Sequence, residues 1–117
     1  MRRLAKSLKH AMKGIFYTFK NERNFQVEIA MAAIVLLLMV WLPISKTENM
    51  MLIISIIVVL ALELVNTAVE RIMDILKPRV HPYARIVKDV MAGAVFVASL
   101  GAFVLGWVIF LPYIFLW

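Results

Sequence analysis

Cysteine is absent from the 117-residue sequence, and histidine occurs only twice, at His10 and His81. Disulfide bonds, thiolate nucleophiles and cysteine-ligated metal sites are therefore excluded, and a histidine-rich zinc site is disfavoured. Glycine is also scarce, with four scattered residues. No G-x-x-x-x-G-K sequence is present to form a phosphate-binding loop, so any nucleotide chemistry must use another arrangement.

Hydrophobic residues, in contrast, make up 64% of the sequence, well above the roughly 45–50% of soluble domains. A chain this short could bury only a modest core in water. A lipid bilayer accommodates such a composition. It also explains the formal net charge of +6 better than nucleic acid does, because anionic lipid surfaces attract lysine and arginine. We therefore expect a single membrane domain over residues 1–117.

Three apolar segments are long enough, with their helical flanks, to cross a bilayer as helices of about 20 residues. We place transmembrane helices at residues 28–43, 49–76 and 86–115. Pro43 ends the first, and a proline-containing break separates the second from the third. The expected fold class is an all-α membrane protein, with a surface helix before the three spans.

Residues 1–24 form that expected surface helix. Its apolar residues recur at helical spacing and its lysines fill the remaining arc, which is typical of an amphipathic helix in a membrane interface. The apolar positions are Leu4, Leu8, Met12, Ile15, Phe16 and Phe19. A disordered basic tail is the alternative, and the aromatic residues on one face favour the helix.

Basic residues are distributed unevenly between the expected spans. Seven lie in the N-terminal segment and five in the 71–89 segment, whereas the 43–49 loop contains only Lys46 and the C-terminus contains none. The positive-inside rule therefore predicts that the N-terminus and the 71–89 loop are cytoplasmic. The 43–49 loop and the C-terminus are expected outside.

Only seven residues are acidic, and five of them cluster near the expected cytoplasmic side. These are Glu22, Glu63, Glu70, Asp74 and Asp89. At 100° per residue, Glu63, Glu70 and Asp74 fall within about 40° of one another on a helix, with Asn66 about 60° to the side. Glu63 follows a long apolar run, and an ionisable group inside a membrane is a candidate functional residue.

These acids also have structural interpretations. Glu63 could bond a neighbouring helix, and Glu70 and Asp74 could form ion pairs with Arg71 or Lys77 at a wet helix end. The shared stripe favours a divalent cation instead, because aligned like charges repel. Mg²⁺ prefers carboxylate oxygens and retains positions for water and phosphate oxygens, and a site with only oxygen ligands favours it over zinc.

The run ELVNTAVE at residues 63–70, followed by Asp74 and Lys88-Asp89, resembles the signature of the bacterial diacylglycerol kinase and undecaprenol kinase family. GIFYTFKNERNF at residues 14–25 is similar to an upstream block of that family. The resemblance covers nearly the whole chain. It implies a kinase of the bacterial cell membrane that transfers the γ-phosphate of ATP to a lipid hydroxyl. It also implies a homotrimer with active sites shared between subunits.

The resemblance further implies roles for individual residues. Glu63 would be the general base that removes the proton from the lipid hydroxyl, with Asn66 positioning it. Glu22 and Glu70 would hold the Mg²⁺ that bridges the ATP phosphates. The nucleotide-binding residues implied are Tyr17, Asp74, His81, Lys88 and Asp89.

Asn21 and Glu28 would belong to the surrounding polar shell. Arg79, where an acid can occur in the family, and Gln26, where a basic residue can occur, leave the nucleotide contacts and the lipid open. The sequences GIFYTFKNERNF and KDVMAGAV are more similar to the undecaprenol branch of the family. This similarity favours conversion of undecaprenol to undecaprenyl phosphate, with phosphorylation of diacylglycerol to phosphatidic acid as the alternative.

A small oligomeric membrane transporter is an alternative of another class. Transporter sites lie near the bilayer midplane, whereas the acids here gather at one interface. A non-catalytic membrane adaptor would not need the polar stripe. Small residues near the start and middle of the third span, such as Gly93 and Gly101, would allow close helix contact within or between subunits.

Overall fold

The computed structural model describes residues 1–76 and 82–115. These residues form four helices: α1 (Arg2–Asn21), α2 (Arg23–Trp41), α3 (Lys46–Leu76) and α4 (Pro82–Phe115). α2, α3 and α4 are each long and apolar enough to cross a membrane. The expected all-helical fold with three long apolar helices is therefore confirmed.

The helix ends follow local sequence signals. At the start of α3, the Glu48 N–H donates to Ser45 Oγ and the Ser45 N–H donates to Glu48 Oε1, both at 3.1 Å. This reciprocal pair is a capping box, which satisfies N–H groups that have no partner in the first turn. α4 begins at Pro82, where proline is tolerated because its missing N–H would have no helical partner.

A break at a single residue separates α1 from α2. Glu22 is extended (φ −116°, ψ 112°), while its N–H still donates to the Thr18 carbonyl oxygen at 2.8 Å. α2 then starts at Arg23, earlier than the expected boundary at residue 28, because the polar residues before the apolar run continue the helix. Glu22 therefore lies at the corner where the chain changes direction.

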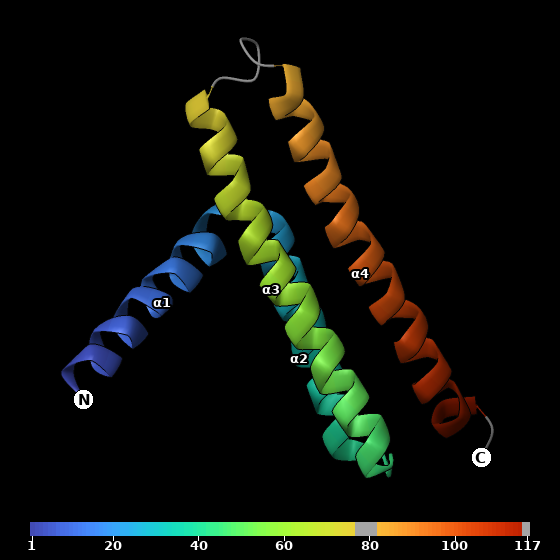
Figure 1. The fold of residues 1–117 in the computed structure, drawn as a ribbon. Coiled ribbons are helices and arrows are strands. Elements are labelled where there is room, and N and C mark those ends of the chain that lie inside the picture. The colour runs from blue at the N-terminus through green and yellow to red at the C-terminus, as the bar shows by residue number, and fades with distance from the viewer. Residues whose placement is uncertain (77–81, 116–117) are drawn as a thin grey trace.

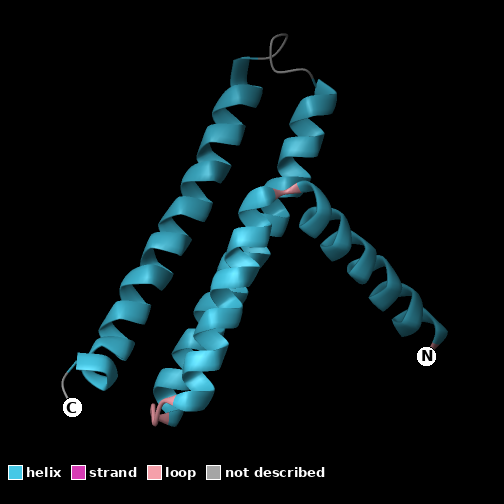
Figure 2. Ribbon diagram, turned by 180° about the vertical axis from the view of Figure 1, so that it is seen from behind, coloured by secondary structure: helices cyan, strands magenta, loops and turns pink. Residues whose placement is uncertain are grey.

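α3 is the central helix and packs against α4, α2 and α1. α4 runs antiparallel to it (Figure 1). α2 lies along the N-terminal part of α3, up to the level at which the α1–α2 corner meets α3. Viewed from behind, the corner meets α3 part-way along its length, and α1 diverges from the other helices (Figure 2). The C-terminal part of α3 thus extends beyond α2.

The apolar core lies toward the end of the bundle that contains the α2–α3 connection. Leu52, Ile109 and Phe110 are buried there. Many large apolar side chains elsewhere are exposed, among them Val40 at 81% and Trp41 at 82%. Exposed apolar surface along three spanning-length helices is expected where lipid or another subunit covers it.

Candidate active site

Buried polar side chains gather where the α1–α2 corner meets α3. Thr18, Glu63, Asn66 and Thr67 are all buried, and Glu63 is only 1% exposed. The two threonine hydroxyls donate to backbone oxygens of their own helices: Thr67 Oγ1 to the Glu63 carbonyl oxygen and Thr18 Oγ1 to the Gly14 carbonyl oxygen, each at 3.0 Å. Neither threonine hydroxyl donates to the Glu63 carboxylate or to the Asn66 amide.

Glu63 and Asn66 retain buried oxygens with no hydrogen-bond partner among the described residues. These atoms are Glu63 Oε2 and Asn66 Oδ1. The Asn66 Nδ2 group donates to Glu70 Oε1 at 3.2 Å, which orients the amide. Buried polar atoms are nearly always paired, so a pair of free acceptors indicates a place for an external donor or cation.

More negative charge surrounds Glu63. Glu22 and Glu70 are close enough for their charges to repel that of Glu63, and Glu63 and Glu28 repel each other. Glu28 Oε2 is a third buried oxygen without a partner. The stripe expected on α3 is thus joined by carboxylates from the corner and from α2.

Arg71 provides the positive charge in this region. Its Nη2 lies 2.7 Å from Glu22 Oε1, and its Nε donates to the Tyr17 hydroxyl at 2.7 Å. Its Nη1 lies 3.9 Å from both Glu70 Oε2 and Asp74 Oδ2. One guanidinium therefore contacts side chains from α1, the corner and α3.

The remaining expected site residues lie farther along α3 and α4 or on α1. Lys88 Nζ is 3.4 Å from Asp74 Oδ1, which joins the C-terminal part of α3 to the first turns of α4. Asp89 is exposed. Asn21 is also exposed, and its Nδ2 donates to the Tyr17 carbonyl oxygen at 2.8 Å. His81 lies outside the described residues.

The structure therefore places most of the expected residues near the α1–α2 corner and along the C-terminal part of α3, and Asn21 and Asp89 are exposed. The structural interpretation of Glu70 and Asp74 predicts ion pairs with Arg71, and both ion pairs are present. The contacts of Arg71 with Tyr17 and Glu22 were missed, because they join residues 54 and 49 positions apart. The only sign of these contacts in the sequence is that a charged residue, Arg71, directly follows Glu70.

The carboxylate oxygens are suitable ligands for a hard cation, although the side chains are not arranged as a complete metal site. Within residues 1–76 and 82–115, no three His, Asp or Glu side chains are arranged to hold a metal ion. Glu22 and Glu70 nevertheless flank the same cation, the Arg71 guanidinium. Carboxylate oxygens and the free oxygens of Glu63 and Asn66 are the donor type that Mg²⁺ prefers.

An apolar groove leads away from this polar cluster. It has a volume of about 580 Å³ and lies on α3 between α2 and α4, with Glu28 and Asn24 among its lining residues. Its inner wall includes Leu60 on α3 and Phe103 on α4. Because Glu28 also neighbours Glu63, a molecule in the groove could place a polar end near the buried carboxylates.

Comparison with known proteins identifies the family. Residues 9–110 match the prokaryotic diacylglycerol kinase family. The chain is 39% identical to undecaprenol kinase of Bacillus subtilis over 112 residues, which cover 96% of this chain and 91% of that protein. It is 36% identical to diacylglycerol kinase of Haemophilus influenzae over 95 residues, which cover 81% and 80% of the two chains. The chain therefore belongs to the prokaryotic diacylglycerol kinase family and is a membrane lipid kinase.

Proposed function

We propose that this kinase phosphorylates undecaprenol with ATP, and that Glu63 is its general base. The observation that carries the assignment is the buried Glu63 carboxylate, 1% exposed, with Oε2 unpartnered beside the free oxygen of Asn66. Burying a carboxylate without a full set of partners is unfavourable. Such a group is retained where it performs chemistry.

In the proposed reaction, the oxygen of the lipid hydroxyl attacks the γ-phosphorus of ATP. A new O–P bond forms, the bond from the γ-phosphorus to the β,γ-bridging oxygen breaks, and ADP leaves with that electron pair. Glu63 Oε2 takes the hydroxyl proton and later releases it to water. Asn66, held by its hydrogen bond to Glu70, orients the base or the hydroxyl.

Glu22 and Glu70 would hold Mg²⁺, which neutralises charge on the ATP phosphates when it is bound. Lys88 is paired with Asp74, which lies one turn after Glu70 on α3. There the lysine would contact a phosphate oxygen. Tyr17, His81 and Asp89 complete the proposed nucleotide site. Asn21 and Glu28 are proposed to support it as part of the polar shell.

The groove between α2 and α4 suits the long apolar chain of a lipid alcohol. Its largely apolar lining and its neighbouring Glu28 would place a hydroxyl near Glu63. Undecaprenol is favoured because the relative named undecaprenol kinase is 39% identical over almost the full chain. Diacylglycerol is the second candidate, since a relative at 36% identity has that lipid in its name.

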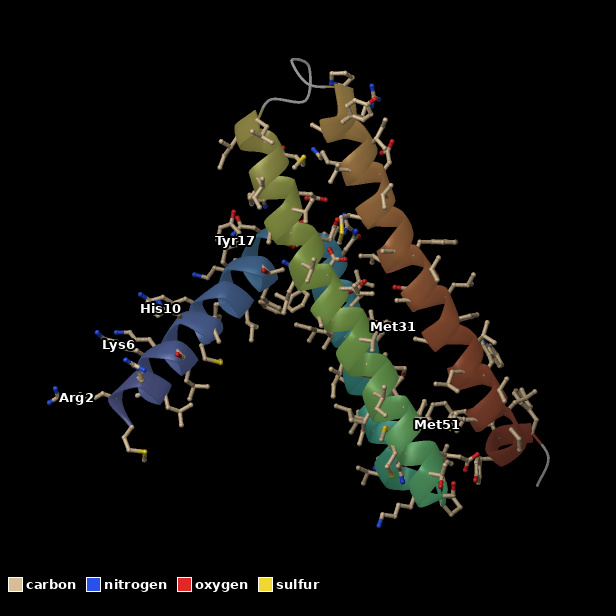
Figure 3. All side chains as sticks on the ribbon, in the orientation of Figure 1. Arg2, Lys6, His10, Tyr17, Met31 and Met51 are labelled. Atoms are coloured by element: carbon tan, nitrogen blue, oxygen red, sulfur yellow. The ribbon has the colours of Figure 1, made fainter. Side chains whose placement is uncertain are left out.

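We propose that the N-terminus and the polar cluster face the cytoplasm, where ATP is available, and that the C-terminus lies outside. α1 would rest in the membrane interface, and Figure 3 shows Arg2, Lys6 and His10 along its length. A homotrimer is also proposed. In support, a Cβ built on Gly93 or Gly101 would meet no described atom of another helix within 4 Å, so these glycines leave room for another subunit.

The experiment is phosphate transfer by purified protein in lipid vesicles with [γ-³²P]ATP and Mg²⁺. Undecaprenol and diacylglycerol are supplied together in equal amounts, and the labelled lipids are separated. We expect label mainly in undecaprenyl phosphate. Label mainly in phosphatidic acid would replace undecaprenol by the second candidate, and unlabelled lipid with intact protein would contradict the assignment.

A further inference from the structure

The orientation of α1 depends on few contacts with the rest of the molecule. α1 packs against α2 and α3 only near its C-terminal end, and its N-terminal part diverges from the bundle (Figure 1). The corner at Glu22 contains neither glycine nor proline. Gln26 Nε2 donates to the Phe19 carbonyl oxygen at 2.7 Å across the corner, but this bond joins α1 only to α2.

Arg71 connects the same segment to α3. Its Nε donates to the Tyr17 hydroxyl, its Nη2 donates to Glu22 Oε1, and both distances are 2.7 Å. The guanidinium carbon also lies 5.6 Å from the centroid of the Tyr17 ring, within the range of a cation–π contact. Tyr17 itself lies where α1 approaches α3 (Figure 3).

The planar guanidinium suits this position better than other cations. It donates through separate nitrogens to an acceptor on α1 and to another at the corner, so it fixes two points at once. The Glu22 side chain is 18% exposed, which makes its pair with Arg71 less screened than a surface ion pair. A lysine ammonium would provide charge at a single point.

We propose that Arg71 is a positioning residue: its guanidinium holds α1 against α3 through Tyr17 and Glu22, and thereby fixes the Glu22 carboxylate beside Glu70. The proposal that Arg71 holds α1 against α3 concerns the fold alone. The consequence for Mg²⁺ rests on the proposed function, because Glu22 is one of its proposed ligands. Arg71 would thus set both the orientation of the surface helix and the geometry of the acidic cluster.

The position of α1 can be measured without turnover. Because the chain has no cysteine, Lys6→Cys on α1 and Ile75→Cys on α3 provide a unique pair of spin-label sites, and both native residues are exposed. Doubly labelled protein is diluted with an excess of unlabelled protein in vesicles, so that distances within one subunit dominate. Pulsed electron paramagnetic resonance then gives the distribution of label–label distances.

We expect a narrow distribution with Arg71 present and a distinctly broader one in Arg71→Gln. Arg71→Lys and Tyr17→Phe, which each keep part of the contact, should give intermediate widths. The matched control is Arg85→Gln, which removes one exposed positive charge from α4 and should leave the distribution narrow. Equal widths in Arg71→Gln and Arg85→Gln would overturn the proposal.

A second measurement links the contacts of Arg71 with Tyr17 and Glu22 to the proposed function. The Mg²⁺ concentration for half-maximal lipid phosphorylation should rise on the order of tenfold in Arg71→Gln, the scale of one charge-assisted hydrogen bond, and stay unchanged in Arg85→Gln. A broadened distance distribution with an unchanged Mg²⁺ requirement would contradict the role of Arg71 in placing Glu22. Failure of the unmutated protein to phosphorylate lipid would instead contradict the proposed function, whatever the distances.

Discussion

The two ends of the α2–α3–α4 bundle bury different kinds of side chain. At one end Leu52, Ile109 and Phe110 form an apolar core. At the other end, Glu63 and Asn66 are buried, although polar groups are unfavourable in such surroundings. The same central helix, α3, supplies residues to both ends.

The ends also differ in how their carboxylates are bonded. Glu48, near the apolar core, accepts hydrogen bonds from the Tyr113 hydroxyl at 2.6 Å and from the Ser45 N–H at 3.1 Å. Glu63, in contrast, has a buried oxygen with no partner among the described residues. A bonded carboxylate stabilises helix ends, whereas an unbonded one is available to a substrate. The comparison therefore separates an end whose carboxylate is held by hydrogen bonds from the end where we propose the reaction takes place.

The largest expected effect comes from Glu63→Gln, which keeps the shape of the side chain and removes the proposed base. The turnover number for lipid phosphorylation should fall about 10²–10⁴-fold, the usual contribution of a general base. Initial rates of ³²P transfer to lipid measure this loss. Glu48→Gln is the matched control and should retain turnover; equal losses in the two variants would remove the distinction between the ends.

A smaller effect is expected from Glu70→Gln. Loss of one proposed carboxylate ligand should raise the Mg²⁺ concentration for half-maximal activity roughly tenfold to a hundredfold, the scale of a charge-assisted contact. High Mg²⁺ should restore part of the activity. Titration of Mg²⁺ in the phosphorylation assay checks this, and activity that no Mg²⁺ concentration improves would indicate that Glu70 has a structural role.

At the apolar end, Leu52→Ala should reduce stability and spare chemistry. Leu52 is 1% exposed, so its truncation leaves a cavity. The loss should fall near the lower limit of the roughly 2–5 kcal/mol found for buried leucines, because lipid also solvates apolar side chains. Unfolding in mixed detergent micelles measures the change. A large fall in turnover per folded molecule would contradict the separation of the two ends.

The smallest effect is expected from Tyr113→Phe, which removes the hydroxyl that Glu48 binds. The unfolding midpoint should fall slightly, since Glu48 keeps its contacts with Ser45. Thermal unfolding in vesicles or detergent gives the midpoint, and lipid phosphorylation at low temperature should match that of the unmutated protein. A marked loss of activity without unfolding would assign the apolar end a part in the reaction.

Much of the fold could be predicted from the sequence, because apolar length and helical spacing determine which segments can cross a membrane. The three long apolar helices are confirmed. The change from surface helix to first span is predicted at residues 24–28, whereas the corner lies at Glu22, in polar sequence without glycine or proline. There, packing of α1 and α2 against α3 decides the direction of the chain.

The site could be predicted only in part. The alignment of Glu63, Glu70 and Asp74 depends on one helix, so helical periodicity predicts it. The contact of Arg71 with Tyr17 joins residues 54 positions apart and depends on the approach of α1 to α3. Spacing along the chain contains no information on that approach. The catalytic, metal and nucleotide roles of the named residues stay predictions that the variants above would test.

The most direct test of the proposed active site is to locate the bound nucleotide. Spin labels are placed one at a time at Ile75→Cys and Met50→Cys, exposed positions that lie roughly 37 Å apart along the axis of α3. The protein is saturated with the Mn²⁺ complex of a non-hydrolysable ATP analogue, and Mn²⁺–nitroxide distances are measured. We expect a much shorter distance from the label at position 75, because Mn²⁺ takes the place of the Mg²⁺ proposed at Glu22 and Glu70. A shorter distance from position 50, or equal distances, would contradict binding of the nucleotide-bound metal at Glu70, which lies roughly 8 Å from position 75 and roughly 30 Å from position 50 along the helix axis.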